Sequence, residues 1–360
     1  MRKRLRIGVR LLAVWLGCGL MTTGCWDYHD INHRTVPVIM GISKGQEKRY
    51  KVSLQIPIPA ERKLNVKVVS REAATVSEGI DVIRVDVENY IDLLSIQLIV
   101  VSQGIAQEGL KDEMANAIRS TMFSPKTLLA VTSGDMVELL SNTKNAITND
   151  ITTFYKFANK RAGWTPKTAK TSLMESFVST RSYTQDILLP IIKPGRETVL
   201  EFDGSALMKE GKMIGRLSDQ ETLFVNVVTN RYYGADVEVL QNASLTILAA
   251  HMNWSSRMTG NGPELVGKLR LQTSLSESRT EKSKSQHVSD LETLFSKNLK
   301  QVTDKLIQTG ADPMGMGNHF RSKIPFEKLA KWRSDYYPEL KVRYHVQVEI
   351  ANLGSLVQAE

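Results

Sequence analysis

The spacing of apolar side chains predicts strands at both ends of the chain. Residues 36–58 begin with the apolar run VPVIMGI and continue, after the polar turn SKGQE, as YKVSLQIPIP. The second run alternates apolar and polar positions, a period of two that is typical of a strand with one buried face. Residues 341–354, KVRYHVQVEIANLG, alternate in the same way, so we expect a final strand there.

The first half of the chain sets strand patterns beside helix patterns. SIQLIVVSQ (95–103) and TLLAVTSG (127–134) are dense in aliphatic residues and predict buried strands. Helix patterns occur at 71–86, at 135–142, and where Leu110, Met114 and Ile118 recur at intervals of four. Strands that alternate with helices favour an α/β or α+β fold over an all-β sandwich.

The strongest helix pattern covers residues 288–309. Its apolar positions share one helical face: Val288, Leu291, Phe295, Val302 and Leu306. Ser289 is the N-cap that we expect, and Gly310 suits the C-terminal end.

Two turn signals organise the second half. KPGRE at 193–197 indicates a boundary between domains, and KEGK at 209–212 separates two apolar stretches as the turn of a hairpin would. Further strand patterns lie on either side of SSRMTGNG (255–262), which we interpret as a loop.

These patterns together predict an α+β protein of several domains, with mixed β-sheets flanked by helices. We expect an N-terminal α+β region at 25–195 and a C-terminal α+β domain at 196–360. The C-terminal domain would contain the long helix 288–309 and the final strand 341–354.

Residues 1–24 have the pattern of an export signal. Five basic residues precede the apolar run 11–21, and small residues lead to Cys25. The run of about 11 residues is well short of the roughly 20 that span a bilayer as a helix. Gly24–Cys25 resembles a bacterial lipobox, in which the thiol receives diacylglycerol and the cysteine becomes the acylated N-terminus. We therefore expect a cleaved lipoprotein signal peptide and lipid attachment at Cys25.

The second cysteine, Cys18, is a less suitable cleavage site. Cutting there would shorten the apolar run and place Trp15 and Leu16 where small residues are needed. The chain has no cysteine after Cys25, which excludes a disulfide framework and a thiolate zinc cluster in the mature protein.

The charge of the mature chain is mild. The full sequence has a net charge of +9, and removal of residues 1–24 takes away five basic residues and leaves +4. Without a long basic run or an arginine-rich helix, nucleic acid is not an expected partner.

The sequence offers little catalytic chemistry. His29 and His33 in HDINH faintly resemble a zinc helix, but no third ligand or flanking apolar helix accompanies them. His251, His287, His319 and His345 show no ligand spacing. Without a nucleophile elbow, a P-loop or a dinucleotide fingerprint, we expect no enzyme activity, no cofactor and no metal site.

The segment TGADPMGMGNHFR (309–321) has two interpretations. Asp312 and Pro313 suit a turn, while Gly315 and Gly317 allow positive φ or close backbone approach. The segment could be a loop that binds a ligand or a partner. We favour a structural connector, with Phe320, Ile324 and Trp332 packed beneath it.

Three stretches resemble the Ger(x)C family, the C-subunit lipoproteins of nutrient germinant receptors in endospore-forming bacteria. They are GCWD at 24–27, FDGSALMKEGKMIGRLSDQET at 202–222, and the region from the long helix through DPMGMG and Trp332 to the final NLG. They occur in the family's order and span nearly the whole mature chain. Thr22, and Tyr28–His29 after WD, depart from the family pattern.

This resemblance implies a fold, a location and partners. The fold would be α+β in three domains, and the protein would be held by Cys25 on the outer face of the spore inner membrane. Its partners would be the multi-spanning A subunit and the transporter-like B subunit of a receptor that triggers germination. Whether this subunit binds the nutrient itself stays open. The alternative is a lipid-anchored solute-binding protein of a transporter, with ligand held between two similar lobes.

Overall fold

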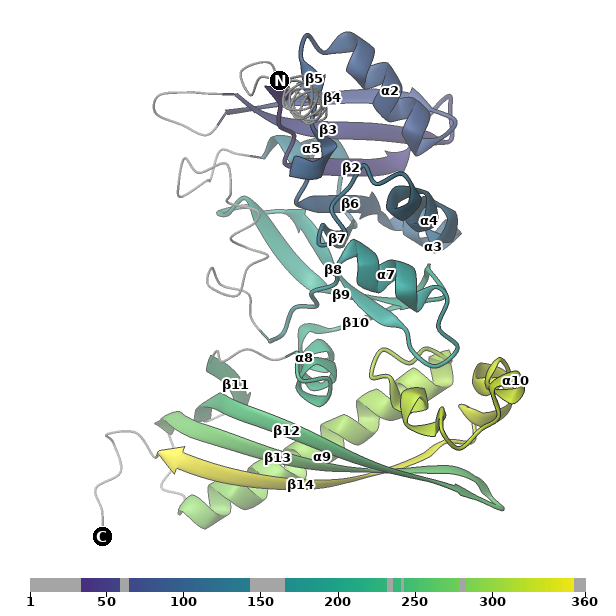
Figure 1. Ribbon diagram of the computed structural model, residues 1–360. Helices are drawn as coiled ribbons and strands as arrows, with labels where there is room; N and C mark the ends of the chain where they lie inside the picture. Colours follow the sequence, from purple (N-terminus) through teal and green to yellow (C-terminus); the bar gives the residue numbers. More distant parts are fainter. Residues whose placement is uncertain are drawn as a thin grey trace, which may run out of the picture. The chain divides into compact units, whose positions relative to one another are not determined.

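The structure is a computed structural model that describes residues 34–58, 65–142, 166–231, 236–240, 243–278 and 283–352 (Figure 1). The chain divides at Arg34/Thr35 into two units, and apart from Arg34 the elements described below belong to the second unit. The expected signal peptide, Cys25, His29 and His33 lie outside the described residues.

An eight-stranded mixed sheet dominates the first part of the chain, with strand order β10-β9-β8-β7-β6-β2-β3-β4. The central strands β2, β6, β7 and β8 pair in parallel, while β3 and β4 on one side and β9 and β10 on the other pair antiparallel. The bounds are β2 Ile39–Lys44, β3 Tyr50–Ile58, β4 Asn65–Ala73, β6 Leu98–Ser102, β7 Leu128–Thr132, β8 Ile187–Pro194, β9 Leu200–Lys209 and β10 Lys212–Leu217. Two short strands, β1 Arg34–Thr35 and β5 Tyr90–Ile91, lie outside this sheet.

Helices cover both faces of the eight-stranded sheet. In β6, Ile99 and Val101 point into one core with α2, α3, α4 and α7, and Leu98 and Val100 point into another with α5. The bounds are α2 Val76–Asp86, α3 Gln103–Glu108, α4 Lys111–Arg119, α5 Met136–Ser141 and α7 Leu173–Ser179. A strand buried on both faces needs apolar side chains at successive positions, which explains the continuous run in this strand.

The second sheet has four strands in the order β11-β12-β13-β14. Its bounds are β11 Asp236–Leu240, β12 Ala243–Thr259, β13 Gly262–Ser278 and β14 Lys341–Asn352. The strands β12 and β13 form one long hairpin, and β14 pairs in parallel with β13. The helix α9, Lys284–Thr309, runs along this sheet and returns the chain to the start of β14 (Figure 1). A parallel pair requires such a crossover.

One apolar core is shared by the two sheets through α8, Asp219–Val228. Phe224 of α8 meets Phe295 of α9 edge to face, with ring centroids 5.3 Å apart. Leu207 and Leu217 of the first sheet and Leu269 of the second belong to the same cluster. Aromatic pairs of this kind add about 0.5–1.5 kcal/mol beyond the burial of their area.

The expected fold class, α+β with mixed sheets and flanking helices, is confirmed. The hairpin around KEGK is also confirmed, since β9 and β10 pair on either side of it. The turn at 193–197 separates β8 from β9, but these two strands pair with each other within one sheet. The division into 25–195 and 196–360 therefore stays a prediction.

Three local predictions were wrong. The long helix begins at Lys284, and its N-cap is Ser283, because Ser283 and Gln286 form a reciprocal capping box that Ser289 lacks. The segment 255–262 is no loop, since β12 continues to Thr259 and only Gly260 and Asn261 turn the hairpin. The first residues of 71–86 extend β4, and the helix begins only after the Thr75 N-cap.

Substitution of Leu299 tests the packing of the core beneath α9, because the Leu299 side chain is fully buried there. Leu299→Ala is expected to lower the free energy of unfolding by about 2–5 kcal/mol, because it removes buried methyl groups and leaves a cavity. Gln301→Ala on the exposed side of the same helix is the control and is expected to change it by less than about 0.5 kcal/mol. Urea denaturation measures both, and equal effects would contradict the described packing.

Candidate functional site

Two glycines shape the turn that follows α9. Gly315 precedes the 3-10 turn Met316–Phe320 in the left-handed conformation, with φ of 67°. Gly317 allows close approach instead, because a Cβ at this position would lie 2.5 Å from Nε1 of Trp332 and 3.0 Å from Cβ of Thr184. The turn thus contains both features predicted for its glycines, positive φ and a close backbone contact.

Trp332 is the centre of an aromatic cluster under this turn. Its ring stacks on Phe320, with centroids 5.1 Å apart, and on Tyr336 at 6.1 Å. Phe320, Ile324 and Trp332 are all buried. The short helix α10, Phe326–Leu329, and the π-helical turn Trp332–Tyr336 carry the chain around this cluster. The packing expected for 309–321, over these three residues, is confirmed, and the choice between a connector and a binding loop stays a prediction.

A buried ion pair holds the same turn to the start of β8. The Arg333 guanidinium donates to both carboxylate oxygens of Asp186, and its Nη2 lies 2.9 Å from Oδ1. The backbone N–H of Asp312 donates to Oδ2 of Asp186 at 2.9 Å, and that of Glu210 donates to Oδ1 at 3.3 Å. Asp186 therefore connects β8, the β9–β10 hairpin and the turn after α9.

Asp312 is a second buried carboxyl in this network. It accepts the backbone N–H groups of Met316 at 3.0 Å and Gly317 at 2.8 Å. Burial raises the pKa of Asp312 from 3.8 to about 7, and the neighbouring Asp186 adds to the rise, while the two hydrogen bonds and Arg333 oppose it. The carboxyl fixes the backbone of the turn and carries a titration near neutral pH.

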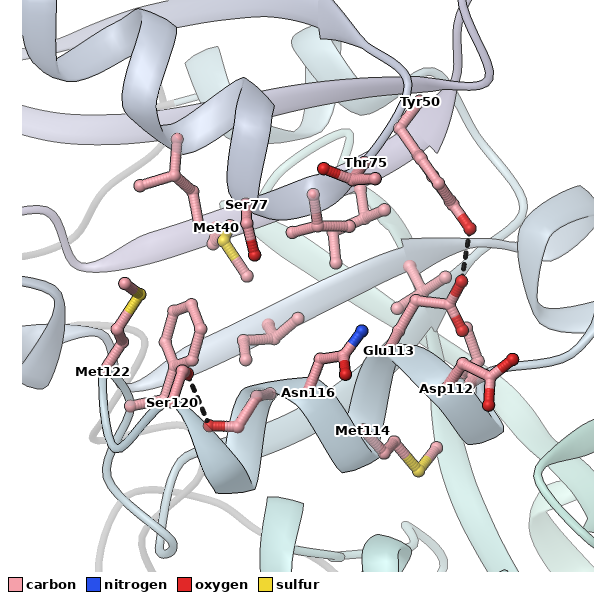
Figure 2. Close-up of a pocket in the computed structure, with 18 of the residues that line it drawn as sticks. Met40, Tyr50, Thr75, Ser77, Asp112, Glu113, Met114, Asn116, Ser120 and Met122 are labelled. Carbon is pink, nitrogen blue, oxygen red and sulfur yellow. Dashed lines mark hydrogen bonds between the residues drawn. The ribbon is translucent and has the colours of Figure 1, made fainter.

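A separate cavity of about 210 Å³ opens on the eight-stranded sheet between the start of α2 and α4 (Figure 2). Its inner surface is apolar and comes from strands and helices together: Met40, Ile42, Ile80, Ile99, Val101, Leu110, Met114, Phe123, Leu129 and Leu173. Its polar lining consists of Arg49, Tyr50, Thr75, Ser77, Asp112, Glu113, Asn116 and Ser120, and Tyr50, Glu113 and Asp112 lie at the end away from Met40 and Met122 (Figure 2). An apolar chamber with a few converging polar groups is the usual form of a small-molecule site.

Tyr50 and Glu113 define one side of the cavity mouth. The Tyr50 hydroxyl donates to Oε1 of Glu113 (Figure 2), and the Arg49 guanidinium lies over the Tyr50 ring at 4.9 Å from its centroid. Burial raises the pKa of Tyr50 well above its usual range, and the bond to Glu113 raises it further. Tyr50 therefore stays a hydrogen-bond donor at neutral pH and orients the Glu113 carboxylate.

Comparison with family models matches both halves of the chain. Residues 27–194 match the model described as "Spore germination protein N-terminal domain", and residues 203–354 match "Spore germination B3/ GerAC like, C-terminal". The chain belongs to the GerAC spore germination family. A solved structure described as the crystal structure of the GerBC protein has a similar fold, with a TM-score of 0.57 and 19% identity over 87% of this chain and 97% of that chain. None of the curated proteins compared with the chain matches it.

The site residue expected from the sequence of this GerAC family member, Cys25, lies outside the described residues. Of the expected non-ligand histidines, His251 and His345 are exposed on the second sheet, while His287 is buried in α9. His319 lies against Trp254, with ring centroids 5.5 Å apart. The described ranges contain no cluster of histidine and acidic side chains arranged to hold a metal ion. None of the helices described is both long and apolar enough to span a bilayer.

The cavity was not predicted from the sequence. Its walls come from segments that are far apart in the chain, from Met40 on β2 to Leu173 on α7. Each of these residues also fits an ordinary core pattern. The sequence does show two acidic residues in the first turn of α4, Asp112 and Glu113. Such residues are common at helix N-termini, because their negative charge interacts favourably with the helix dipole, so they did not indicate a binding site.

Substitution of either turn glycine is expected to destabilise the fold, for a different physical reason in each case. Gly315→Val forces a branched side chain into positive φ, and Gly317→Ala drives a methyl group against Trp332. Each is expected to lower the free energy of unfolding by about 1–3 kcal/mol. Gly260→Ala is the control, since a Cβ there meets nothing within 4 Å. Thermal and urea denaturation measure the three variants, and a neutral Gly315→Val would contradict the described backbone.

The raised pKa of Asp312 is expected to make the free energy of unfolding depend on pH. The folded carboxyl keeps its proton up to a pKa of about 7, whereas the unfolded one releases it near 3.8. Its stabilising contribution is therefore complete below pH 3.8 and is lost as the pH rises to about 7, by at most about 1.4 kcal/mol per pH unit. The free energy of unfolding of the wild type relative to Asp312→Asn is thus expected to fall over this range.

Urea denaturation at a series of pH values measures this difference. Asp304→Asn, which removes an exposed carboxylate paired with Lys300 on α9, is the control for general charge effects. A constant difference between wild type and Asp312→Asn across the range would show that Asp312 keeps an ordinary pKa.

Proposed function

We propose that this protein is the lipid-anchored C subunit of a spore nutrient germinant receptor and is needed for nutrient-triggered germination. The observation that carries the proposal is the match to the two spore germination family models, which together cover 27–194 and 203–354 in the family's order. The fold shared with the GerBC protein supports it.

The proposed anchor is Cys25, modified by S-diacylglycerol and an N-acyl group after removal of residues 1–24. The family match supports this position, because it begins at residue 27, two residues after the cysteine. The same matches support the proposed division into an N-terminal region at 25–195 and a C-terminal domain at 196–360. The lipid would hold the protein on the outer face of the spore inner membrane.

The proposed mode of action is contact with other proteins. The A and B membrane subunits of the receptor would be its partners, and the protein would act without catalysis and without a cofactor. The described polar network supports a scaffolding role, because the oxygens of Asp186 and Asp312 are taken up by backbone N–H groups and Arg333.

The alternative, a solute-binding protein of a transporter, requires two similar lobes. The two main sheets of the described chain differ in strand number, order and direction of pairing. We therefore keep the receptor subunit as the proposal.

A complementation series tests this proposal in spores that lack the gene. Wild type and Cys18→Ala are expected to restore dipicolinate release in response to nutrient and to fractionate with membranes. Cys25→Ala is expected to leave the membrane fraction and to restore germination poorly, because it lacks the acceptor thiol. Membrane retention of Cys25→Ala would refute the anchor, and normal nutrient response of the deletion strain would argue against the receptor role.

A further inference from the structure

The cavity beside α4 has the dimensions of a binding site for a small molecule. Its volume of about 210 Å³ exceeds the roughly 150 Å³ at which an engineered apolar cavity holds benzene. A tightly packed core leaves few voids larger than a water molecule. The space is therefore large enough for a single ring or a short branched chain.

The inner surface of the cavity selects an apolar body. Strand residues such as Met40, Ile99 and Leu129 form part of it, and Met114 and Phe123 add helix and loop contacts. Three of the lining residues are methionines, with Met122 the third. Methionine is flexible and polarisable, so these side chains can adapt to the shape of an apolar guest.

The mouth of the cavity selects a positive charge. Asp112 and Glu113 in the first turn of α4 provide two carboxylates, against the single guanidinium of Arg49, which is already placed over Tyr50. Within the described ranges, Tyr50 is the hydrogen-bond donor that reaches Glu113, and it uses only Oε1. The second oxygen, Oε2, can therefore accept from a ligand.

Figure 2 shows how these groups are placed. Glu113 and Asn116 point from α4 towards the opposite wall, which carries Tyr50, Thr75 and Ser77. A cationic head at Glu113 would lie at the polar mouth, and its apolar body would extend over the Met40 side. The carboxylates of Asp112 and Glu113 thus lie at one end of the cavity, and Ser77, Asn116 and Ser120 add neutral polar groups along it.

We propose that this cavity binds a small molecule with a cationic ammonium head and an apolar body of one ring or a short branched chain. The ammonium group donates to the Glu113 carboxylate, with Asp112 adding attraction, and the body fills the apolar chamber. A free amine and an α-amino acid share this chemistry. Arg49 at the mouth offers a partner for the carboxylate that only the amino acid carries.

Three probes separate these sources on the full-length protein in non-ionic detergent micelles. They are 3-methylbutylamine, L-leucine, and 4-methylpentanoate, which has the apolar body without an ammonium group. With ¹³C-methyl-methionine labelling, the amine or the amino acid, or both, is expected to shift the signals of Met40, Met114 and Met122 in a saturable way. The signals of Met208 and Met316, which do not line the cavity, are expected to stay fixed.

The charge is tested by substitution. Glu113→Gln keeps an acceptor for the Tyr50 hydroxyl and is expected to weaken binding of the ammonium probe at least about tenfold. Asp112→Asn, at an exposed position, is expected to weaken it less. Glu138→Gln removes the same charge from α5 on the other face of the sheet and is expected to leave affinity unchanged. Thermal denaturation of each variant verifies its folding.

Several results would overturn the proposal. They are no saturable shift with either ammonium probe up to the millimolar range, equal binding of 4-methylpentanoate, shifts confined to methionines outside the cavity, or unchanged affinity in Glu113→Gln. The proposal goes beyond the receptor role and does not depend on it. Binding is measured on the isolated protein, and germination is measured in spores. A negative binding result would therefore not contradict the receptor role, and a negative germination result would not contradict the binding proposal.

Discussion

The ion pair between Asp186 and Arg333 is the constraint on which the second half of the fold depends. Asp186 is almost fully buried, and Arg333 is only 11% exposed, so both charges have lost most of their hydration. A buried pair of this kind adds little net stability, but the loss of one partner leaves the other charge uncompensated, at a cost of about 3–5 kcal/mol. The pair thereby specifies where the turn after α9 must lie.

The position of that turn determines how the two sheets share a core. Its backbone is held at Asp312 by Asp186, and Trp332 packs beneath Gly317. The chain then enters β14, which completes the second sheet over α9. The cavity lies instead on the central strands of the eight-stranded sheet, where the parallel strands β2, β6 and β7 form part of its inner surface and α4 supplies Asp112 and Glu113. Scaffold and cavity are thus built from different elements.

The sequence predicted those features that depend on neighbouring residues. Periodicity identified the buried strands and the apolar face of α9, and the glycines of 309–321 indicated a turn with positive φ. The sequence pattern placed this helix at 288–309 with Ser289 as its N-cap, because a serine before an apolar pattern resembles an N-cap. The actual N-cap, Ser283, has the partner Gln286. The pairing of Asp186 with Arg333 joins residues 147 positions apart, and such contacts leave no local pattern. The cavity was missed for the same reason.

We propose that this protein functions within a membrane receptor of several subunits. The most direct measurement is isolation of a tagged form from detergent-solubilised spore inner membranes, followed by quantitative mass spectrometry. We expect two membrane proteins, the proposed A and B subunits, to accompany the wild-type chain in equal amounts. Recovery of the chain without either of them, under conditions that keep another membrane complex intact, would contradict it.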